Sequence, residues 1–212
     1  MKQLILFFLI IFFIPKDAFS QAKTNWYGYV DAKTELIGFK DSEGNVKVEP
    51  KFHSFTNTGV FKNIVAVMEK KDLVNGDDFE SENYYLLKNG SKVGKDSLYI
   101  NDYYLDSEKE EKIRFQDPLT QKVGFFDANG KVTIPAIYSD AHPFSNGFAK
   151  VLKDATKMCE NGLPFSKDNL CEHPGWKGGE TLIINSKNET VFEKANQLDF
   201  QHINWYTLQI NP

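Results

Sequence analysis

Two cysteines and a histidine form the group of residues in this sequence whose chemistry could extend beyond folding. Cys159, Cys171 and His173 lie in a loop-like stretch, residues 157–179, together with Trp176. Two cysteines in a loop-rich part of an exported chain typically form a disulfide. The alternatives are free thiols, or a zinc or copper site that uses both thiolates and the imidazole. Structural zinc sites usually contain closely spaced ligand pairs, which this stretch lacks, so we favour a Cys159–Cys171 disulfide.

The remaining polar side chains show no arrangement typical of catalysis. His53, His142 and His202 each stand alone, which favours ordinary surface or partly buried histidines. One acidic group could bind a divalent cation, although a solvated loop explains it better: Asp77, Asp78, Glu80 and Glu82. The chain contains no Gly-x-Ser-x-Gly or His-Glu-x-x-His motif and no glycine-rich phosphate loop. We therefore predict no catalytic residue, no cofactor and no metal site.

The amino terminus predicts export. Lys2 precedes an unbroken apolar run from Leu4 to Ile14, and small residues follow at Ala18 and Ser20, the positions that a signal peptidase reads. We predict that residues 1–20 are a signal peptide cleaved between Ser20 and Gln21, a retained anchor being the alternative. The apolar run is shorter than the roughly 20 residues that span a bilayer, so we expect no integral membrane span after cleavage. The expected location is periplasmic or extracellular.

The charge pattern argues against a nucleic-acid partner. The chain has a formal net charge of -4, and its lysines are scattered among acidic residues. Arg114 is its only arginine, and the planar guanidinium is the group on which bidentate recognition of phosphates and bases depends. Phe and Tyr are abundant, as expected for a β-type core in a single domain spanning residues 21–212.

An internal repeat organises the chain. Residues 29–52 align without a gap on residues 115–138. The identical columns are Asp31/Asp117, Thr34/Thr120, Gly38/Gly124, Phe39/Phe125, Asp41/Asp127, Gly44/Gly130 and Val46/Val132. Random matching at ordinary composition gives only one or two identities over such a length, so this is a true repeat.

The shared columns predict short strands joined by tight turns. Gly38 and Gly124 sit between apolar residues of a strand, where a missing side chain leaves room for a neighbouring backbone. Asp41 with Gly44, and Asp127 with Gly130, combine an Asx side chain with a residue that tolerates positive φ, as a hairpin turn requires. A proline follows in each unit, Pro50 or Pro135, and we expect it to end the returning strand.

This pattern resembles a known repeat family. The motif G-[FY]-x-D-x-x-G-x-V-x-[IV]-P, followed by an aromatic residue and F-S-x-G-[FL]-A-x-V, occurs from Gly124 to Val151 and resembles the bacterial WG-repeat (KWG-type) family. The name-giving Trp is absent, since Ile37 and Val123 occupy its column. The resemblance implies an often exported, β-rich repeat protein with no family-wide catalytic residues.

The predicted fold is therefore all-β, with antiparallel hairpins built from WG-type repeats and stacked or curled into one repeat domain. The units span about 29–68 and 115–152, and a degenerate unit spans about 181–193 with Asn188 in the turn-glycine column. Between the first two, residues 69–112 are read as an elaborated repeat or inserted hairpins, with strand-like stretches at 84–87 and 98–105. A last strand is expected from Trp205 to Ile210.

Two classes of function fit this pattern. The leading hypothesis is an exported, non-catalytic binding module of the cell envelope, whose edge strands and exposed aromatic residues contact an unknown protein or glycan. The competing hypothesis is a metal-binding protein or enzyme with its site in the loop 157–179. A third reading is a structural spacer, which would have flat polar faces.

Overall fold

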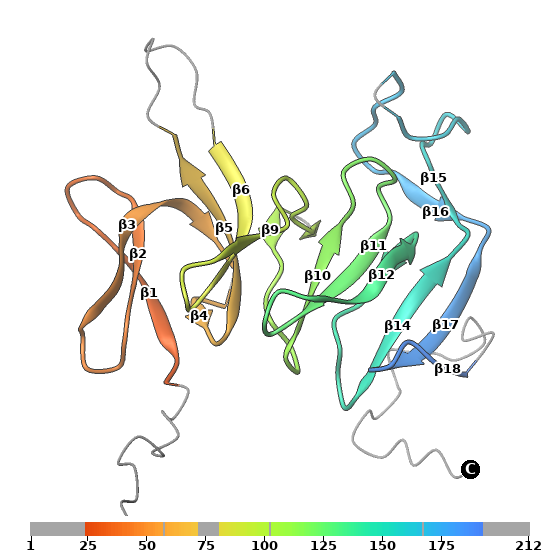
Figure 1. Ribbon diagram of the computed structural model, residues 1–212. Helices are drawn as coiled ribbons and strands as arrows, with labels where there is room; N and C mark the ends of the chain where they lie inside the picture. Colours follow the sequence, from red (N-terminus) through yellow and green to blue (C-terminus); the bar gives the residue numbers. More distant parts are fainter. Residues whose placement is uncertain (1–23, 57, 72–80, 102, 167, 193–212) are drawn as a thin grey trace, which may run out of the picture.

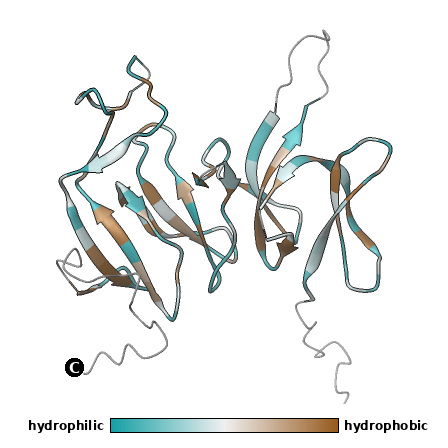
Figure 2. Cartoon of the chain, turned by 180° about the vertical axis from the view of Figure 1, so that it is seen from behind, coloured by the Kyte–Doolittle hydropathy of each residue, from teal (hydrophilic) through white to brown (hydrophobic). Residues whose placement is uncertain are grey.

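Every regular element in the described part of the chain is a strand of an antiparallel sheet. The computed structural model describes residues 24–56, 58–71, 81–101, 103–166 and 168–192, and none of these lies in a helix. The pairings between their strands are antiparallel, which confirms the predicted all-β fold. Two groups of strands lie side by side, with β8 (Ile100–Asn101) and β9 (Tyr104–Leu105) between them (Figure 1). Apolar residues gather along the strands and polar residues in the connecting loops (Figure 2).

The first sheet is curled, because two strands that are consecutive in the chain pair with strands at different places in the sheet. Its strands are β1 (Trp26–Val30), β2 (Ile37–Lys40), β3 (Val46–Phe55), β4 (Val60–Phe61), β5 (Ile64–Lys70), β6 (Ser81–Leu87) and β7 (Lys92–Val93). Their order is β4-β1-β2-β3-β5-β6-β7. β4 pairs with β1, whereas β5 pairs with β3. The sheet therefore bends round an aromatic core in which Phe39, Phe52 and Phe61 are fully buried.

The second group of strands repeats the first. Its strands are β10 (Lys112–Gln116), β11 (Val123–Asp127), β12 (Val132–Tyr138), β13 (Asp140–Ala141), β14 (Phe148–Lys153), β17 (Glu180–Asn185) and β18 (Thr190–Phe192). They form the sheets β10-β11-β12 and β13-β14-β17-β18. Tyr29 pairs with Gly38 between β1 and β2, as Phe115 pairs with Gly124 between β10 and β11. β3 thus corresponds to β12 with β13, β5 to β14, and β6 to β17.

The same hairpin turn recurs at five places in the described chain. Residues 41–45, 87–91, 127–131, 159–163 and 185–189 share two backbone hydrogen bonds, and the fourth turn residue has positive φ: Gly44, Gly90, Gly130, Gly162 or Asn188. In the third turn the Asp127 carboxylate also accepts hydrogen bonds from the amides of Asn129 and Lys131. Asn188 takes the place of glycine at φ 66°, as the degenerate unit predicted. The turn at 87–91 escaped sequence analysis because Leu87 replaces the aspartate.

A second aspartate that recurs in both units caps the turn between β1 and β2 and the turn between β10 and β11. Asp117 accepts hydrogen bonds from the backbone amide and the hydroxyl of Thr120, at 2.7 and 2.9 Å. Asp31 makes the same pair of bonds with Thr34. Hydrogen bonds from Thr34 and Thr120 lower the pKa of both carboxylates, so each turn keeps its charged cap at neutral pH. These interactions explain why Asp and Thr recur together in the two units.

The expectation that proline ends the returning strand is wrong. β3 continues through Pro50, and β12 continues through Pro135. The register shifts at this point in both hairpins, so each proline lies in a bulge. A bulge leaves ladder positions unpaired, and proline, which has no N–H, fits there without losing a hydrogen bond.

The stretch 98–105, which looks like a single strand in sequence, also differs from expectation. It forms the two short strands β8 and β9, which pair with each other. Other predictions, namely the signal peptide with its Ser20–Gln21 cleavage site and the strand from Trp205 to Ile210, lie outside the described residues. Within the described ranges, no helix is long and apolar enough to cross a bilayer.

A shared core joins the two groups of strands. Residues of β5 and β6 (Ile64, Ala66, Tyr85, Leu87) pack with residues from the second group and the segment before it (Leu98, Leu105, Ile113, Phe115, Phe126). We call this cluster the junction. Beside it, Arg114 is buried against Asp106, which accepts hydrogen bonds from its guanidinium at 2.6 and 3.0 Å. Arg114 also donates to the Ala141 carbonyl, so one side chain ties β10 to β13 and to the preceding segment.

The close approach at Gly124 gives a test of the repeat geometry. A Cβ there would lie 2.6 Å from the Ile134 carbonyl oxygen and 2.8 Å from the Ala136 nitrogen, both backbone atoms. We expect Gly124→Ala to lower the free energy of unfolding by about 1–3 kcal/mol in thermal denaturation. Gly175→Ala is the control, because no atom lies within 4 Å of the added Cβ. Equal stability of the two variants would contradict the proposed role of this glycine.

The buried ion pair gives a second test. Asp106→Asn keeps the size of the side chain but leaves the Arg114 charge uncompensated. We expect a loss of about 3–5 kcal/mol in unfolding free energy, measured by denaturant titration. Lys47→Ala removes an ion pair with Asp41 at the surface, and that change should cost less than about 1 kcal/mol. A similar cost for both substitutions would mean that the junction does not depend on this pair.

Candidate functional site

The stretch 157–179 is a loop closed at its base. The strands β15 (Thr156–Met158) and β16 (Gly175–Lys177) pair with each other, so the two ends of the loop lie together. A disulfide joins Cys159 and Cys171 inside it, the pairing that the sequence favoured. Further hydrogen bonds connect the enclosed residues, including one from the Phe165 amide to the Lys157 carbonyl at 2.8 Å. The loop is therefore a fixed projection from the second group of strands.

The disulfide excludes the zinc or copper site that remained an alternative in the sequence analysis. Zinc and copper bind cysteine as the thiolate, and neither sulfur of a disulfide is one. His173 lies at the surface of the loop. No group of three or more His, Cys, Asp or Glu side chains in the described ranges is placed to hold a metal ion. Of the acidic cluster, Glu82 forms an ion pair with Lys92 at 2.8 Å, and Asp77, Asp78 and Glu80 lie outside the described residues.

A groove of about 780 Å³ lies between this loop and the β10–β11 turn. The residues that line it are Gln116, Pro118, Leu119, Thr120, Gln121, Lys122, Ser139, Ala155, Thr156, Lys157, Phe165, Ser166, Leu170 and Trp176. Leu119 is 92% exposed and Leu170 is 73% exposed, although both are large apolar residues. Trp176 is 40% exposed. Exposed apolar side chains from two separate parts of the chain thus lie together in one groove.

Two different devices position the groove residues. The Asp117 carboxylate accepts a hydrogen bond from the Leu119 amide at 3.1 Å, which holds this leucine at the tip of the turn. Leu170 is placed by its neighbour Cys171, whose sulfur is fixed by the disulfide. Sequence analysis singled out the loop and Trp176 but missed Leu119, because only the fold brings residues 117–122 to the loop.

The charge in the groove is positive. Lys157 Nζ lies 5.3 Å from the centre of the Phe165 ring and 5.6 Å from that of Trp176, within cation–π range. Lys122 donates a hydrogen bond to the Ser139 hydroxyl at 2.9 Å. The described lining includes no carboxylate, while the whole chain is acidic. A partner that enters the groove therefore meets apolar surface with cationic groups at its edge.

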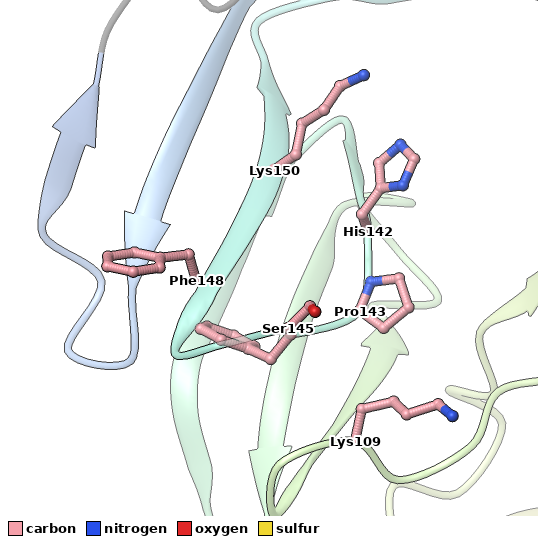
Figure 3. Close-up of a pocket in the computed structure, with 7 residues that line it drawn as sticks. Lys109, His142, Pro143, Ser145, Phe148 and Lys150 are labelled. Carbon is pink, nitrogen blue, oxygen red and sulfur yellow. The ribbon is translucent and has the colours of Figure 1, made fainter. Parts of the chain in front are cut away.

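A second, smaller pocket lies on the outer face of β13 and β14. It has a volume of about 430 Å³ and is lined by Lys109, His142, Pro143, Phe144, Ser145, Phe148 and Lys150. His142 and Lys150 project on the same side, and Lys109 approaches from the segment before β10 (Figure 3). Desolvation, together with the positive charge of Lys150 and Arg114, lowers the pKa of His142 below its ordinary value. His142 thus lies in this pocket, whereas His53 is not part of its described lining; His202 lies outside the described residues.

Comparison with known proteins supports the repeat assignment. Residues 124–155 match the family model described as WG containing repeat, which confirms the resemblance in the second unit. This family is not a known enzyme family. No curated protein matches the chain, and no solved structure matches it.

The disulfide gives a third test. Native protein treated with an alkylating reagent should remain unmodified, and only after reduction should both cysteines react, as intact mass measures. In the chain-entropy account, the double variant Cys159→Ser, Cys171→Ser should lose about 3 kcal/mol of unfolding free energy, because the unfolded loop is no longer restricted. Alkylation of both thiols in the unreduced protein would contradict this loop structure.

Proposed function

We propose that this WG-repeat chain is an exported, non-catalytic binding module of the cell envelope that holds a protein partner in the groove beside its disulfide loop. The observation that carries the proposal is the set of exposed apolar side chains in the groove, above all Leu119 and Leu170. Burying such side chains against a partner is favourable, by roughly 25 cal/mol for each Å² of apolar surface removed from water. A spacer with flat polar faces would not place them together.

The chemistry of the groove favours a protein over a glycan. Leu119 and Leu170 are aliphatic and well exposed, and sugars do not desolvate aliphatic side chains as efficiently as apolar side chains of a protein do. Trp176 supplies the large aromatic surface that is frequent at the energetic centre of protein interfaces. The cationic edge formed by Lys122 and Lys157 fits a partner segment that carries acidic residues.

The rigidity of the groove walls also supports a binding role. The disulfide fixes one wall and the Asp117 turn fixes the other. A surface that is already ordered loses less conformational entropy when a partner binds. The predicted signal peptide and the disulfide agree with an oxidising compartment outside the cytoplasm, where such bonds persist.

Site-specific photo-crosslinking in producing cells tests this function. A photoreactive residue at Leu119 or Leu170 should give a discrete crosslinked product of higher mass, and the additional Trp176→Ala change should weaken it at least tenfold. The control position is Val46, which is 47% exposed in the first group of strands and lies outside the groove. Equal crosslinking from Val46, or none from either leucine, would contradict the groove as the binding site. Detection of the uncleaved protein in the cytoplasm would contradict export.

A further inference from the structure

The segment that joins the two groups of strands ends in a strained turn. The backbones of Lys109 and Lys112 exchange two hydrogen bonds, at 2.8 and 2.9 Å, so residues 109–112 form a two-residue turn at the start of β10. Its central residues, Glu110 and Glu111, have φ of 50° and 59°. A turn with two left-handed residues usually contains Asn-Gly, because a Cβ disfavours this backbone. Two successive glutamates therefore carry a strain that another contact must offset.

The Glu110 carboxylate makes that contact with the turn that leads into β14. One of its oxygens accepts a hydrogen bond from the Asn146 amide, and the other accepts one from the Gly147 amide at 2.8 Å. Asn146 and Gly147 also have positive φ, and successive amides in such a turn converge on one anion. Lys109 and Ser145, the neighbours of the bonded residues, come together from different parts of the chain (Figure 3). We call this contact the Glu110 clamp.

A second glutamate of the same segment holds the first group of strands. The Glu108 carboxylate accepts hydrogen bonds from the Asn63 and Ile64 amides, at 2.8 and 3.1 Å, and from the Asn63 side chain. These amides lie at the start of β5, which corresponds to β14. Glu108 is 7% exposed, whereas Glu110 is at the surface. The Glu110 clamp is therefore the one that can open without exposing a buried charge.

The Glu110 clamp and the groove lie at opposite ends of the same two strands. β10 runs from the turn 109–112 to the groove residue Gln116. β14 runs from the turn with Asn146 and Gly147 toward the groove residue Ala155, over six residues or roughly 20 Å. β10 belongs to the sheet β10-β11-β12 and β14 to the sheet β13-β14-β17-β18, so their backbones do not pair in the described chain. The core between these sheets is apolar, and apolar packing is not directional.

The floor of the groove forms a pivot between the two sheets. The Ser139 hydroxyl, which lies between β12 and β13, accepts hydrogen bonds from Lys122 at 2.9 Å and from the Ala155 amide at 3.0 Å. One hydroxyl thus joins the β10–β11 turn to the base of the disulfide loop. Arg114 adds a bond from β10 to β13. Of these three connections, the Glu110 clamp is the farthest from the groove along β10 and β14, so it has the longest lever arm against rotation of one sheet over the other.

We propose that the Glu110 clamp controls the width of the groove. In the closed state the two sheets are held at a fixed angle, and Leu119 and Leu170 line one groove. In the open state the turn 109–112 relaxes and the sheet that carries the disulfide loop rotates about the groove floor, so the two leucines no longer form one surface. Strain in the turn favours the open state and the two amide bonds favour the closed state, so the clamp is a two-state element. This regulation rests on the proposed function, because the partner binds only the closed groove.

A distance measurement across the groove tests this control without a partner. Spin labels carried by ketone-bearing amino acids replace Leu119 and Leu170 in the full chain, which leaves the disulfide intact, and double electron–electron resonance gives the distribution of their separations. We expect one narrow distribution when Glu110 is present. Glu110→Gln should add a second population or widen the distribution by at least half, because an amide side chain accepts through only one oxygen.

The neighbouring glutamate provides a matched control. Glu111 is also exposed, lies in the same turn, and its side chain forms no hydrogen bond or ion pair within the described residues. Glu111→Gln removes the same charge and should leave the distribution unchanged. In the crosslinking experiment, Glu110→Gln should reduce the product from position 119 at least threefold, and Glu111→Gln should not.

The other results overturn the proposed control. An unchanged distribution in Glu110→Gln would show that the clamp does not set the groove, and equal broadening in Glu111→Gln would assign the effect to the charge of the turn. A broad distribution with Glu110 present would show that the groove has no fixed width to control. The distances do not depend on a partner, so a lack of crosslinking from the unaltered groove would contradict the proposed function alone.

Discussion

The structure depends on one buried ion pair, which joins the first strand of the second group to the segment that precedes it. Arg114 meets Asp106 through its guanidinium and its backbone amide, and it stacks on Tyr99 with its guanidinium carbon 4.1 Å from the ring centre. A buried charge without its partner is strongly unfavourable, so the segment that carries Asp106 must be in place when β10 forms. The pair therefore couples the connecting segment to the second group of strands. It also explains why the only arginine of the chain serves the interior rather than a binding surface.

The candidate groove lies where the repeat is interrupted. The groove exists because a disulfide-closed loop is inserted between β14 and β17, at the position where β5 and β6 are joined in the first group. The regular hairpins form a rigid frame, and the exposed apolar side chains of the groove lie where a loop interrupts that frame.

Features that depend on neighbours in sequence could be predicted, whereas those that depend on distant contacts could not. The turn from Asp127 to Gly130 is local, because aspartate and glycine set its hydrogen bonds and its positive φ. The bulge at Pro135 was missed because it is defined by the register of a neighbouring strand. The loop 157–179 was recognised as a site region from its composition, but the groove needs Leu119 from another hairpin. Likewise, the burial of Arg114 depends on contacts with β13 that no local pattern reveals.

Hydrogen exchange measured by mass spectrometry on the native protein is the most direct test of a stack coupled through the junction. The account predicts that the amides of β5, β6, β10 and β11 exchange slowest and that Asp106→Asn accelerates exchange in all four strands together. Acceleration confined to β10 and β11, with β5 and β6 unchanged, would show that the two groups of strands fold independently. That result would contradict the role of the buried pair and of the junction built beside it.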